Sequence, residues 1–159
     1  MLGQKPHNKG IKVGFEERIN TYRKKFGKDP VLSPFVPETI ICYSERDKRW
    51  VSTTRNSRSS HIFHAKLVWE YYNGKVPPGH HVHHKNGDAS KLEYDDPENL
   101  MLLSEEWNFK RLPVLAKGFG VHESVVTNLY IELLPLGLND EDLFCELCTR
   151  LVLYKKGQG

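Results

Sequence analysis

Residues 79–108 read GHHVHHKNGDASKLEYDDPENLMLLSEEWN, and this segment carries the strongest chemical signal in the chain. Its histidines are His80, His81, His83 and His84, followed at once by a Lys-Asn-Gly-Asp turn. Two asparagines come later, Asn99 in a Glu-Asn-Leu triplet and Asn108 nine residues further on. Neutral imidazole can act as a general base near pH 7, and imidazole and carboxamide groups can both bind a divalent cation. The segment therefore predicts a site that hydrolyses phosphodiesters with the help of one metal ion.

The HHVHH run is predicted to be a short strand, and its register limits which histidines can act together. Successive side chains of a strand point to opposite faces, so His83 and His84 face opposite ways. If Val82 faces the core, His84 lies beside it on the sheltered side and His83 projects away. A shared site for the two rings then requires the strand to end and twist at the turn around Asn86-Gly87.

The first half of the chain is predicted to combine helices with a β-hairpin. Apolar residues at helical spacing predict a helix over residues 15–26, and three prolines make residues 29–38 an extended connector. β-branched and aromatic residues predict two strands, 39–44 and 49–55, joined by a polar turn. A further helix is predicted within residues 61–74, ended by an Asn-Gly pair.

The second half is predicted to be mostly helical. Acidic residues around a proline predict a helix that starts near Pro97 and continues to Arg111. In residues 112–159, Leu115-Ala116 would end a first helix and Gly120 would lie in the turn of a helix-turn-helix-like pair. The last helix has Asn139 as its predicted N-cap and three leucines on one face, Leu143, Leu147 and Leu151.

Charge is distributed unevenly along the 159 residues. Residues 1–60 contain 13 Lys and Arg against 6 Asp and Glu, a net charge of +7, whereas residues 61–111 and 112–159 each have a net charge of −2. Such a basic segment can neutralise nucleic-acid phosphates, and it can equally be a solvated surface that maintains solubility. No apolar run approaches the roughly 20 residues of a membrane span. We expect a cytoplasmic protein with one compact domain or a small core with appendages.

The three cysteines give no disulfide framework. Cys145 and Cys148 form a C-x-x-C pair, which could be half of a zinc site or a redox pair. No second pair at matching spacing exists, and Cys42 is about a hundred residues away. Two thiols three residues apart also suit an amphipathic helix, since free cysteine packs as a small hydrophobe.

The segment HVHHKNGD, followed by Asn99 and Asn108, resembles the HNH endonucleases. The upstream residues 64–88, HAKLVWEYYNGKVPPGHHVHHKNGD, are similar to the version of the motif in phage-encoded and intron homing endonucleases, and the likeness extends roughly over residues 63–108. The resemblance implies an α+β fold with a ββα-metal (His-Me finger) HNH core. In this arrangement a two-stranded hairpin, a loop and a helix hold one ion.

By resemblance, each motif residue has an expected role. His84 corresponds to the catalytic general base that activates water, and His83 to the first metal ligand. Asn99 corresponds to the catalytic middle residue, which tethers the loop and orients the base through a backbone contact. Asn108 corresponds to the last metal ligand, where many members have histidine. One imidazole fewer favours Mg²⁺ or Mn²⁺ as the divalent metal cofactor, and could also mean reduced activity. His64, His80 and His81 are expected to be structural or to contact phosphate.

The resemblance implies DNA as the partner, cut to leave 3′-hydroxyl and 5′-phosphate ends. We expect residues 1–38 to form a basic arm, a short helix and a connector, residues 39–111 the nuclease core, and residues 112–159 a helical section. The residues expected to contact DNA are Lys9, Lys12, Arg23, Lys24, Lys25, Arg55, Arg58 and Lys85. The family's zinc ribbons are missing, so the core must be held by apolar packing.

Two alternatives remain open from the sequence. A non-catalytic DNA-binding protein with a degenerate HNH site would use the helix-turn-helix-like section at residues 115–134, although its second helix carries no basic residues for a DNA groove. The apolar helices of residues 112–159 could instead form a dimer or bind a protein partner, or they could pack on the nuclease core. The sequence leaves the oligomeric state undecided.

Overall fold

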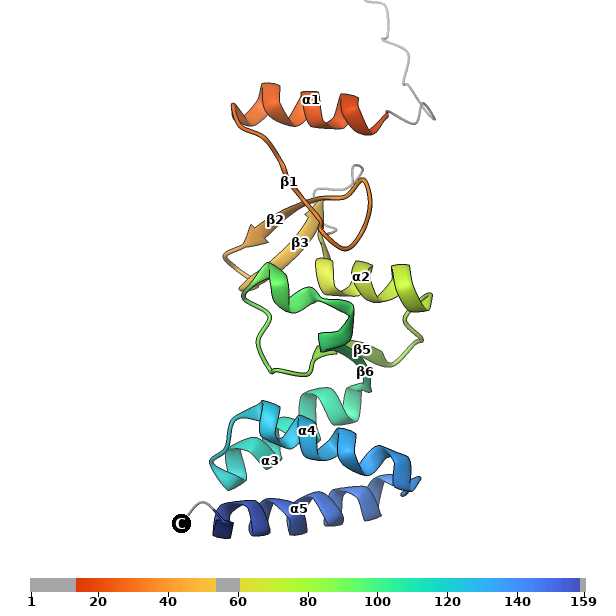
Figure 1. The fold of residues 1–159 in the computed structure, drawn as a ribbon, viewed down its shortest axis with the longest axis vertical. Coiled ribbons are helices and arrows are strands. Elements are labelled where there is room, and N and C mark those ends of the chain that lie inside the picture. Colours follow the sequence, from red (N-terminus) through yellow and green to blue (C-terminus); the bar gives the residue numbers. More distant parts are fainter. Residues whose placement is uncertain (1–13, 54–60, 158–159) are drawn as a thin grey trace, which may run out of the picture.

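The structure, a computed structural model, describes residues 14–53 and 61–157. Helices and two small antiparallel sheets are stacked along the long axis of the molecule (Figure 1). Helix α1 (Phe15–Phe26) lies at one end and a four-stranded sheet follows it. A two-stranded sheet and helix α2 (His64–Asn73) occupy the middle, and three C-terminal helices form the other end. The motif segment therefore lies between two flanking parts of the same chain.

The four-stranded sheet contains the predicted hairpin and two further short strands. β2 (Ile40–Ser44) pairs with β3 (Arg49–Thr53), which confirms the hairpin. β1 (Val31–Leu32) adds to β2, and β4 (His61–Phe63) adds to β3, giving the order β1-β2-β3-β4. Both added strands fall in segments predicted otherwise, as connector and as helix. Strands of two or three residues are too short to carry an alternating pattern.

Helix α1 has the predicted bounds and ends at Gly27, which adopts a left-handed conformation with φ +66°. None of its residues is buried, so α1 contributes little to the core. Helix α2 ends at Asn73 as predicted but begins at His64, because residues 61–63 belong to β4.

β5 (His80–His84) pairs with β6 (Leu100–Ser104) in register, so that His84 lies opposite Leu100 and His83 opposite Met101. The predicted helix from Pro97 to Arg111 is therefore wrong over its first half. The loop before β6 holds only two short turns, η1 (Leu92–Asp95) and η2 (Pro97–Asn99). Periodicity does not separate a continuous apolar run in a fully buried strand from one in a buried helix.

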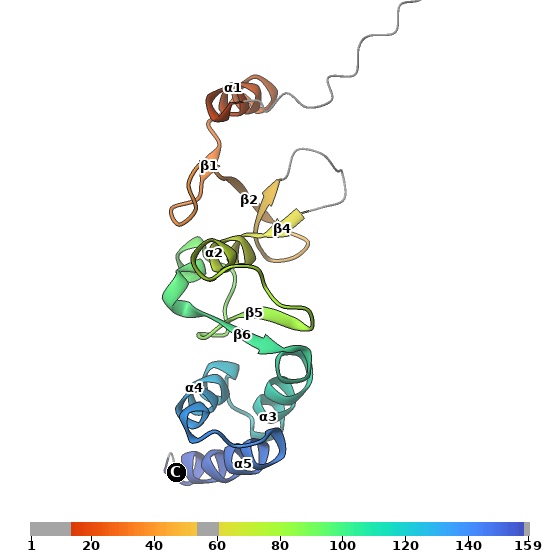
Figure 2. The ribbon, with the colours of Figure 1, turned by 90° about the vertical axis from the view of Figure 1, so that its right-hand side faces the viewer.

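β6 is buried on both faces because it lies between α2 and the C-terminal helices (Figure 2). Leu100 packs on the α2 side with Ala65 and Val68. Met101 and Leu103 pack on the opposite side, in the larger core.

The helix that follows β6 widens before Pro113. The N–H of Leu112 bonds to the carbonyl of Trp107, five residues earlier, in a π-helical turn η3 (Trp107–Arg111). Proline has no N–H to donate and its ring collides with the carbonyl four residues before it, which favours such a wide turn. α3 (Leu112–Phe119) continues the helix and ends three residues later than predicted, with Gly120 as its left-handed cap.

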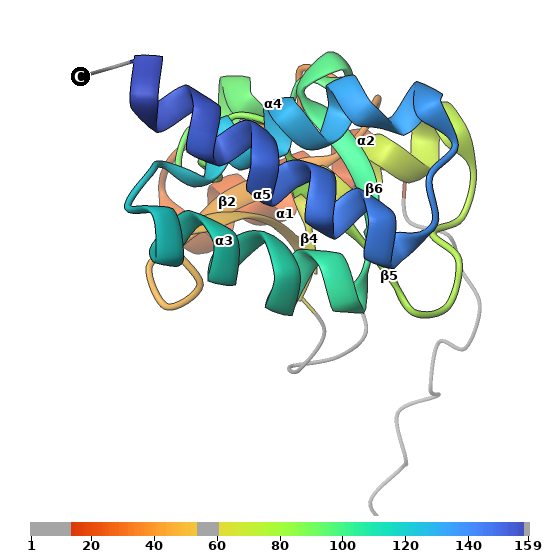
Figure 3. The same cartoon turned by 90° about the horizontal axis from the view of Figure 1, so that it is seen from below.

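α4 (Glu123–Leu133), a short turn η4 (Leu134–Leu136) and α5 (Asp140–Gly157) complete the chain. α5 crosses α3 and α4, as the end-on view shows (Figure 3). Asn139 caps α5 as predicted, its side-chain oxygen accepting from two backbone N–H groups. The larger core joins β6, η3, α3, α4 and α5, and includes the predicted Leu143, Leu147 and Leu151. The C-terminal helices thus share one core with the motif strand.

Cys145 and Cys148 both lie on α5 as free thiols, Cys145 exposed and Cys148 against the larger core. Across residues 14–53 and 61–157, no helix combines the length and apolar character that crossing a membrane requires.

Candidate catalytic and metal-binding site

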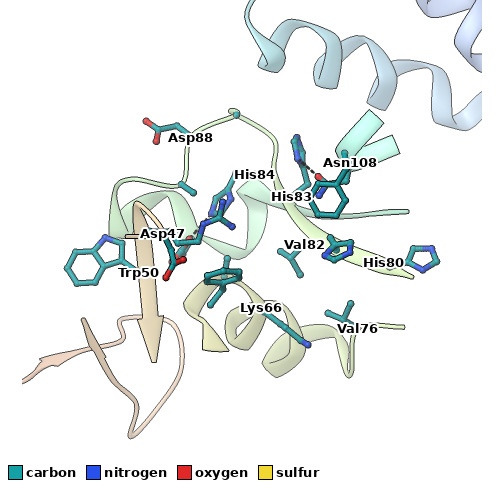
Figure 4. A pocket seen from close by; sticks show the side chains of 18 of the residues that line it. Asp47, Trp50, Lys66, Val76, His80, Val82, His83, His84, Asp88 and Asn108 are labelled. Carbon is teal, nitrogen blue, oxygen red and sulfur yellow. Dashed lines mark hydrogen bonds and ion pairs between the residues drawn. The ribbon is translucent and has the colours of Figure 1, made fainter. Parts of the chain in front are cut away.

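A cleft of about 590 Å³ surrounds the end of β5 and is lined by His83, His84 and Asn108 together (Figure 4). The two histidines leave the strand on opposite faces, as the alternation of side chains requires. Val82 and His84 face α2, whereas His83 faces the helix after β6. The cleft reaches both faces because β5 ends here in a turn, with the Gly87 N–H bonded to the carbonyl of His84.

His83 and Asn108 form a pair at one side of the cleft. The Nδ1 atom of His83 lies 3.0 Å from the Oδ1 atom of Asn108, whose residue belongs to the π-helical turn η3. His83 is only 7% exposed, and burial lowers the pKa of its imidazole from the ordinary value. The ring is therefore neutral near pH 7, which is the form that binds metal ions. Its other nitrogen, Nε2, lies 3.2 Å from the hydroxyl of Thr127 on α4.

This pair has the donor chemistry and spacing for a small divalent cation. Two neighbouring ligands of an octahedral Mg²⁺ or Mn²⁺, each at about 2.1 Å, are themselves about 3.0 Å apart. Nδ1 of His83 and Oδ1 of Asn108 have this separation. Within the described ranges, no group of three or more His, Cys, Asp or Glu side chains is arranged to hold a metal. A cation held by this pair alone would take its remaining ligands from water or substrate.

His84 is held by a buried carboxylate. Its Nε2 atom lies 2.7 Å from Oδ1 of Asp95, a residue only 2% exposed at the end of the turn η1. An ionised carboxylate accepts hydrogen bonds and cannot donate them, so the proton of the ring is on Nε2. No atom in residues 14–53 or 61–157 forms a hydrogen bond with Nδ1 of His84, which leaves that nitrogen with a lone pair for a water molecule.

Asp95 also accepts a hydrogen bond from a second buried histidine. Nδ1 of His64, a fully buried residue on α2, lies 2.7 Å from Oδ2 of Asp95. On the far side of that ring, Nε2 lies 2.7 Å from the hydroxyl of Ser33. Burial alone would raise the pKa of Asp95, but the hydrogen bonds from His64 and His84 outweigh it, so the pKa lies below its ordinary value. A chain of hydrogen bonds therefore runs from Ser33, just after β1, through His64 of α2 and Asp95 to His84.

Asn99 ties the loop to the turn after β5. Its backbone carbonyl accepts from the Lys85 N–H, its side-chain oxygen accepts from the Asn86 N–H at 3.2 Å, and its amide donates to the carbonyl of Tyr94 at 2.7 Å. These contacts hold the residues next to His84. The ring of His84 is itself bonded to Asp95, not to Asn99.

The residues expected to contact DNA are dispersed. Arg23, Lys24 and Lys25 lie exposed on α1, where Arg23 also pairs with Asp29. Lys85 lies in the turn directly after β5, and its side chain donates to the carbonyl of Glu98. The other four, Lys9, Lys12, Arg55 and Arg58, fall outside the described residues.

The sequence alone does not assign three residues to the site. Asp95 is one of the acidic residues around Pro97 that predict a helix start, and nothing in YDDPENL separates it from Asp96. His64 was expected to be structural or phosphate-contacting, and its only signal was its place at the start of the HNH-like segment. Thr127 lies 43 positions after His84 in a helix predicted on other grounds.

The segment that contains His83, His84 and Asn108 matches a known protein family. A family model described as HNH endonuclease matches residues 64–108, which begin at His64 and end at Asn108. The search of curated proteins and the search of solved structures return no match.

Proposed function

We propose that this chain, whose residues 64–108 match the HNH endonuclease family model, is a metal-dependent DNA endonuclease that hydrolyses phosphodiester bonds. The observation that carries the proposal is the convergence of His83, His84 and Asn108 on one cleft. Two of them form a donor pair 3.0 Å apart, and the third offers a free ring nitrogen.

In this proposal β5, β6 and the helix after Ser104 form the ββα-metal core. His83 and Asn108 hold the cation. When bound, a divalent cation adds positive charge beside the phosphate and the leaving oxygen, where negative charge develops. His84 takes a proton from water through Nδ1, and the resulting imidazolium is stabilised by the carboxylate of Asp95. Asn99 keeps the turn after β5 in place, so that His84 and His83 hold their positions relative to each other.

The first test is metal dependence of plasmid nicking. Supercoiled plasmid should be nicked in Mg²⁺ or Mn²⁺, and EDTA should abolish nicking. Replacing Asn108 by alanine removes one of two protein ligands. We therefore expect the Mn²⁺ concentration for half-maximal rate to rise by at least about tenfold, which a titration of rate against Mn²⁺ measures.

Tyr94→Phe is a matched control, because only the backbone carbonyl of Tyr94 accepts the hydrogen bond from Asn99. It should leave the Mn²⁺ dependence as in the wild type. Nicking that persists at full rate in EDTA, with repurified protein, contradicts the proposed function.

The DNA backbone is proposed to contact the basic face of α1. This helix buries none of its residues and carries Arg23, Lys24 and Lys25 in its last turn. Each lysine that neutralises a phosphate contributes about one unit to the slope of log K against log salt. The double variant Lys24→Ala/Lys25→Ala should therefore bind DNA more weakly and reduce that slope by about two. Fluorescence anisotropy at several salt concentrations measures both.

Lys155 and Lys156 provide a matched control, since they occupy the last turn of α5 at the opposite end of the molecule (Figure 1). Their double alanine variant has the same change in net charge and should leave the slope unchanged. If both double variants lost DNA affinity and salt dependence equally, the total charge of the protein, and not α1, would determine DNA binding.

A further inference from the structure

We propose that Thr127 is a positioning residue for metal binding, whose hydroxyl holds His83 in the orientation and tautomer that present Nδ1 to the cation. The inference rests on the proposed function and deepens it. It assigns a role in the site to α4, which lies outside the family match at residues 64–108.

The hydroxyl of Thr127 is directed differently from those of other threonines on helices of this chain. Thr21 and Thr149 donate to the backbone carbonyl four residues earlier, the common pattern for threonine within a helix. Thr127 has no exposed surface, and its Oγ1 atom lies 3.2 Å from Nε2 of His83 on another element. Within the described part of the chain, Oγ1 of Thr127 has no other hydrogen bond. The imidazole of His83 is therefore the hydrogen-bond partner of the Thr127 hydroxyl.

A hydroxyl suits this position because the ring needs a different partner in each state. A neutral imidazole carries one N–H. Without an ion, Nδ1–H of His83 donates to Oδ1 of Asn108, and Nε2 accepts from the hydroxyl of Thr127. A cation on Nδ1 requires that nitrogen without hydrogen, so the proton is then on Nε2 and needs an acceptor. A hydroxyl can donate or accept after a rotation about its C–O bond, and so serves both states.

The position of α4 relative to the metal ligand is fixed by packing. The start of α4 abuts the turn after His84: a Cβ atom on Gly87 would lie 3.1 Å from Cε1 of His122 and 3.4 Å from the backbone N of Ser124. Val126 and Tyr130 anchor the same helix in the larger core. Thr127 therefore reaches His83 from a rigid support.

Glu123 is the other polar group near Nε2, and it offers a matched control. Its Oε1 atom lies 3.7 Å from Nε2 of His83, beyond the range of a hydrogen bond. If the carboxylate, not the hydroxyl, orients the ring, Glu123→Gln should weaken metal binding.

The test compares Mn²⁺ binding to the wild type and to Thr127→Val, Thr127→Ser and Glu123→Gln, by calorimetry and by electron paramagnetic resonance. Loss of an outer partner of a ligating histidine lowers metal affinity about 10–100-fold. We expect Thr127→Val, which keeps the shape and removes the hydroxyl, to bind Mn²⁺ that much more weakly. Thr127→Ser should restore wild-type affinity, and Glu123→Gln should retain it.

A second measurement uses the wild type alone and does not depend on how the variants fold. The ¹⁵N resonances of the His83 ring report which nitrogen carries the proton. We expect the proton on Nδ1 in EDTA and on Nε2 in saturating Mg²⁺. Wild-type Mn²⁺ affinity in Thr127→Val overturns the role of Thr127 alone. A proton that stays on Nδ1 in Mg²⁺ would show that Nδ1 of His83 does not bind the cation, and overturns the ligand assignment of His83 together with the role of Thr127. A wild type that neither binds Mn²⁺ nor nicks plasmid overturns the proposed function, and the inference with it.

Discussion

Replacing His84 by alanine is expected to lower the rate of DNA cleavage by about 10²–10⁴-fold, the usual contribution of a general base. His84 is the residue in the cleft whose ring nitrogen is free while its other nitrogen is fixed by a buried carboxylate. DNA affinity should remain that of the wild type, because the proposed phosphate contacts are on α1. Single-turnover nicking in Mn²⁺ and anisotropy binding on the same preparation measure the two quantities.

His61→Ala is the control for this prediction, since His61 is exposed on β4 and does not line the cleft. It should cleave at the wild-type rate. Cleavage at the wild-type rate by repurified His84→Ala protein, confirmed as folded by thermal melting, would remove the general base from the mechanism.

Replacing Asp95 by alanine is expected to lower the free energy of unfolding by about 2–6 kcal/mol, because two buried imidazole N–H groups lose their acceptor, at about 1–3 kcal/mol each. The fully buried His64 and the nearly buried His84 would both lose their acceptor. Urea unfolding in EDTA measures the loss. Cleavage should fall as well, since the tautomer of His84 is no longer fixed.

The neighbouring Asp96 gives a control of the same residue type. Among the described residues, its side chain accepts a hydrogen bond only from the Glu98 N–H of the short turn η2, so Asp96→Ala should lower the free energy of unfolding by about 1 kcal/mol or less. If Asp95→Ala and Asp96→Ala lowered the free energy of unfolding equally, the hydrogen bonds around Asp95 would add no more stability than the cap of a short turn.

The contribution of Asp95 to the free energy of unfolding should decrease at acidic pH. Burial raises the pKa of Asp95, but the two imidazole hydrogen bonds outweigh it and the net pKa is below its ordinary value. The pKa of an aspartate in the unfolded chain is about 3.9, and the ionised Asp95 stabilises the fold fully above that pH. This stabilisation is lost as the pH falls from about 3.9 through the lower pKa that Asp95 has in the folded protein. The gap in unfolding free energy between wild type and Asp95→Ala should narrow over that acidic range.

Elements with a strong local pattern were predictable from the sequence. The helix at residues 15–26, the hairpin of β2 and β3, the strand at His80–His84 and the Asn139 cap all follow from periodicity or from the chemistry of one residue. β6 did not, because Leu100–Leu103 has the same apolar residues whether it is a strand or a helix, and only pairing with β5 decides. Tertiary contacts, not local propensity, determine that segment.

The residues of the candidate site also fall into two groups, those that the sequence could identify and those that it could not. The motif residues His83, His84, Asn99 and Asn108 could be named from the resemblance to the HNH motif, and alternation in β5 correctly separated the two histidines. Asp95 and Thr127 could not be named, because each acts only through a neighbour in space. The carboxylate at 95 and the hydroxyl at 127 become informative once the fold brings them to the ring nitrogens of His84 and His83.

The most direct measurement is an anomalous diffraction map of crystals grown with Mn²⁺ and a DNA duplex, using the His84→Ala variant to prevent cleavage. The account predicts one Mn²⁺ peak that contacts both Nδ1 of His83 and Oδ1 of Asn108, with a DNA phosphate beside it and the Cβ atom of residue 84 facing that phosphate. A Mn²⁺ peak bound to other residues, or DNA bound away from this cleft, would contradict it.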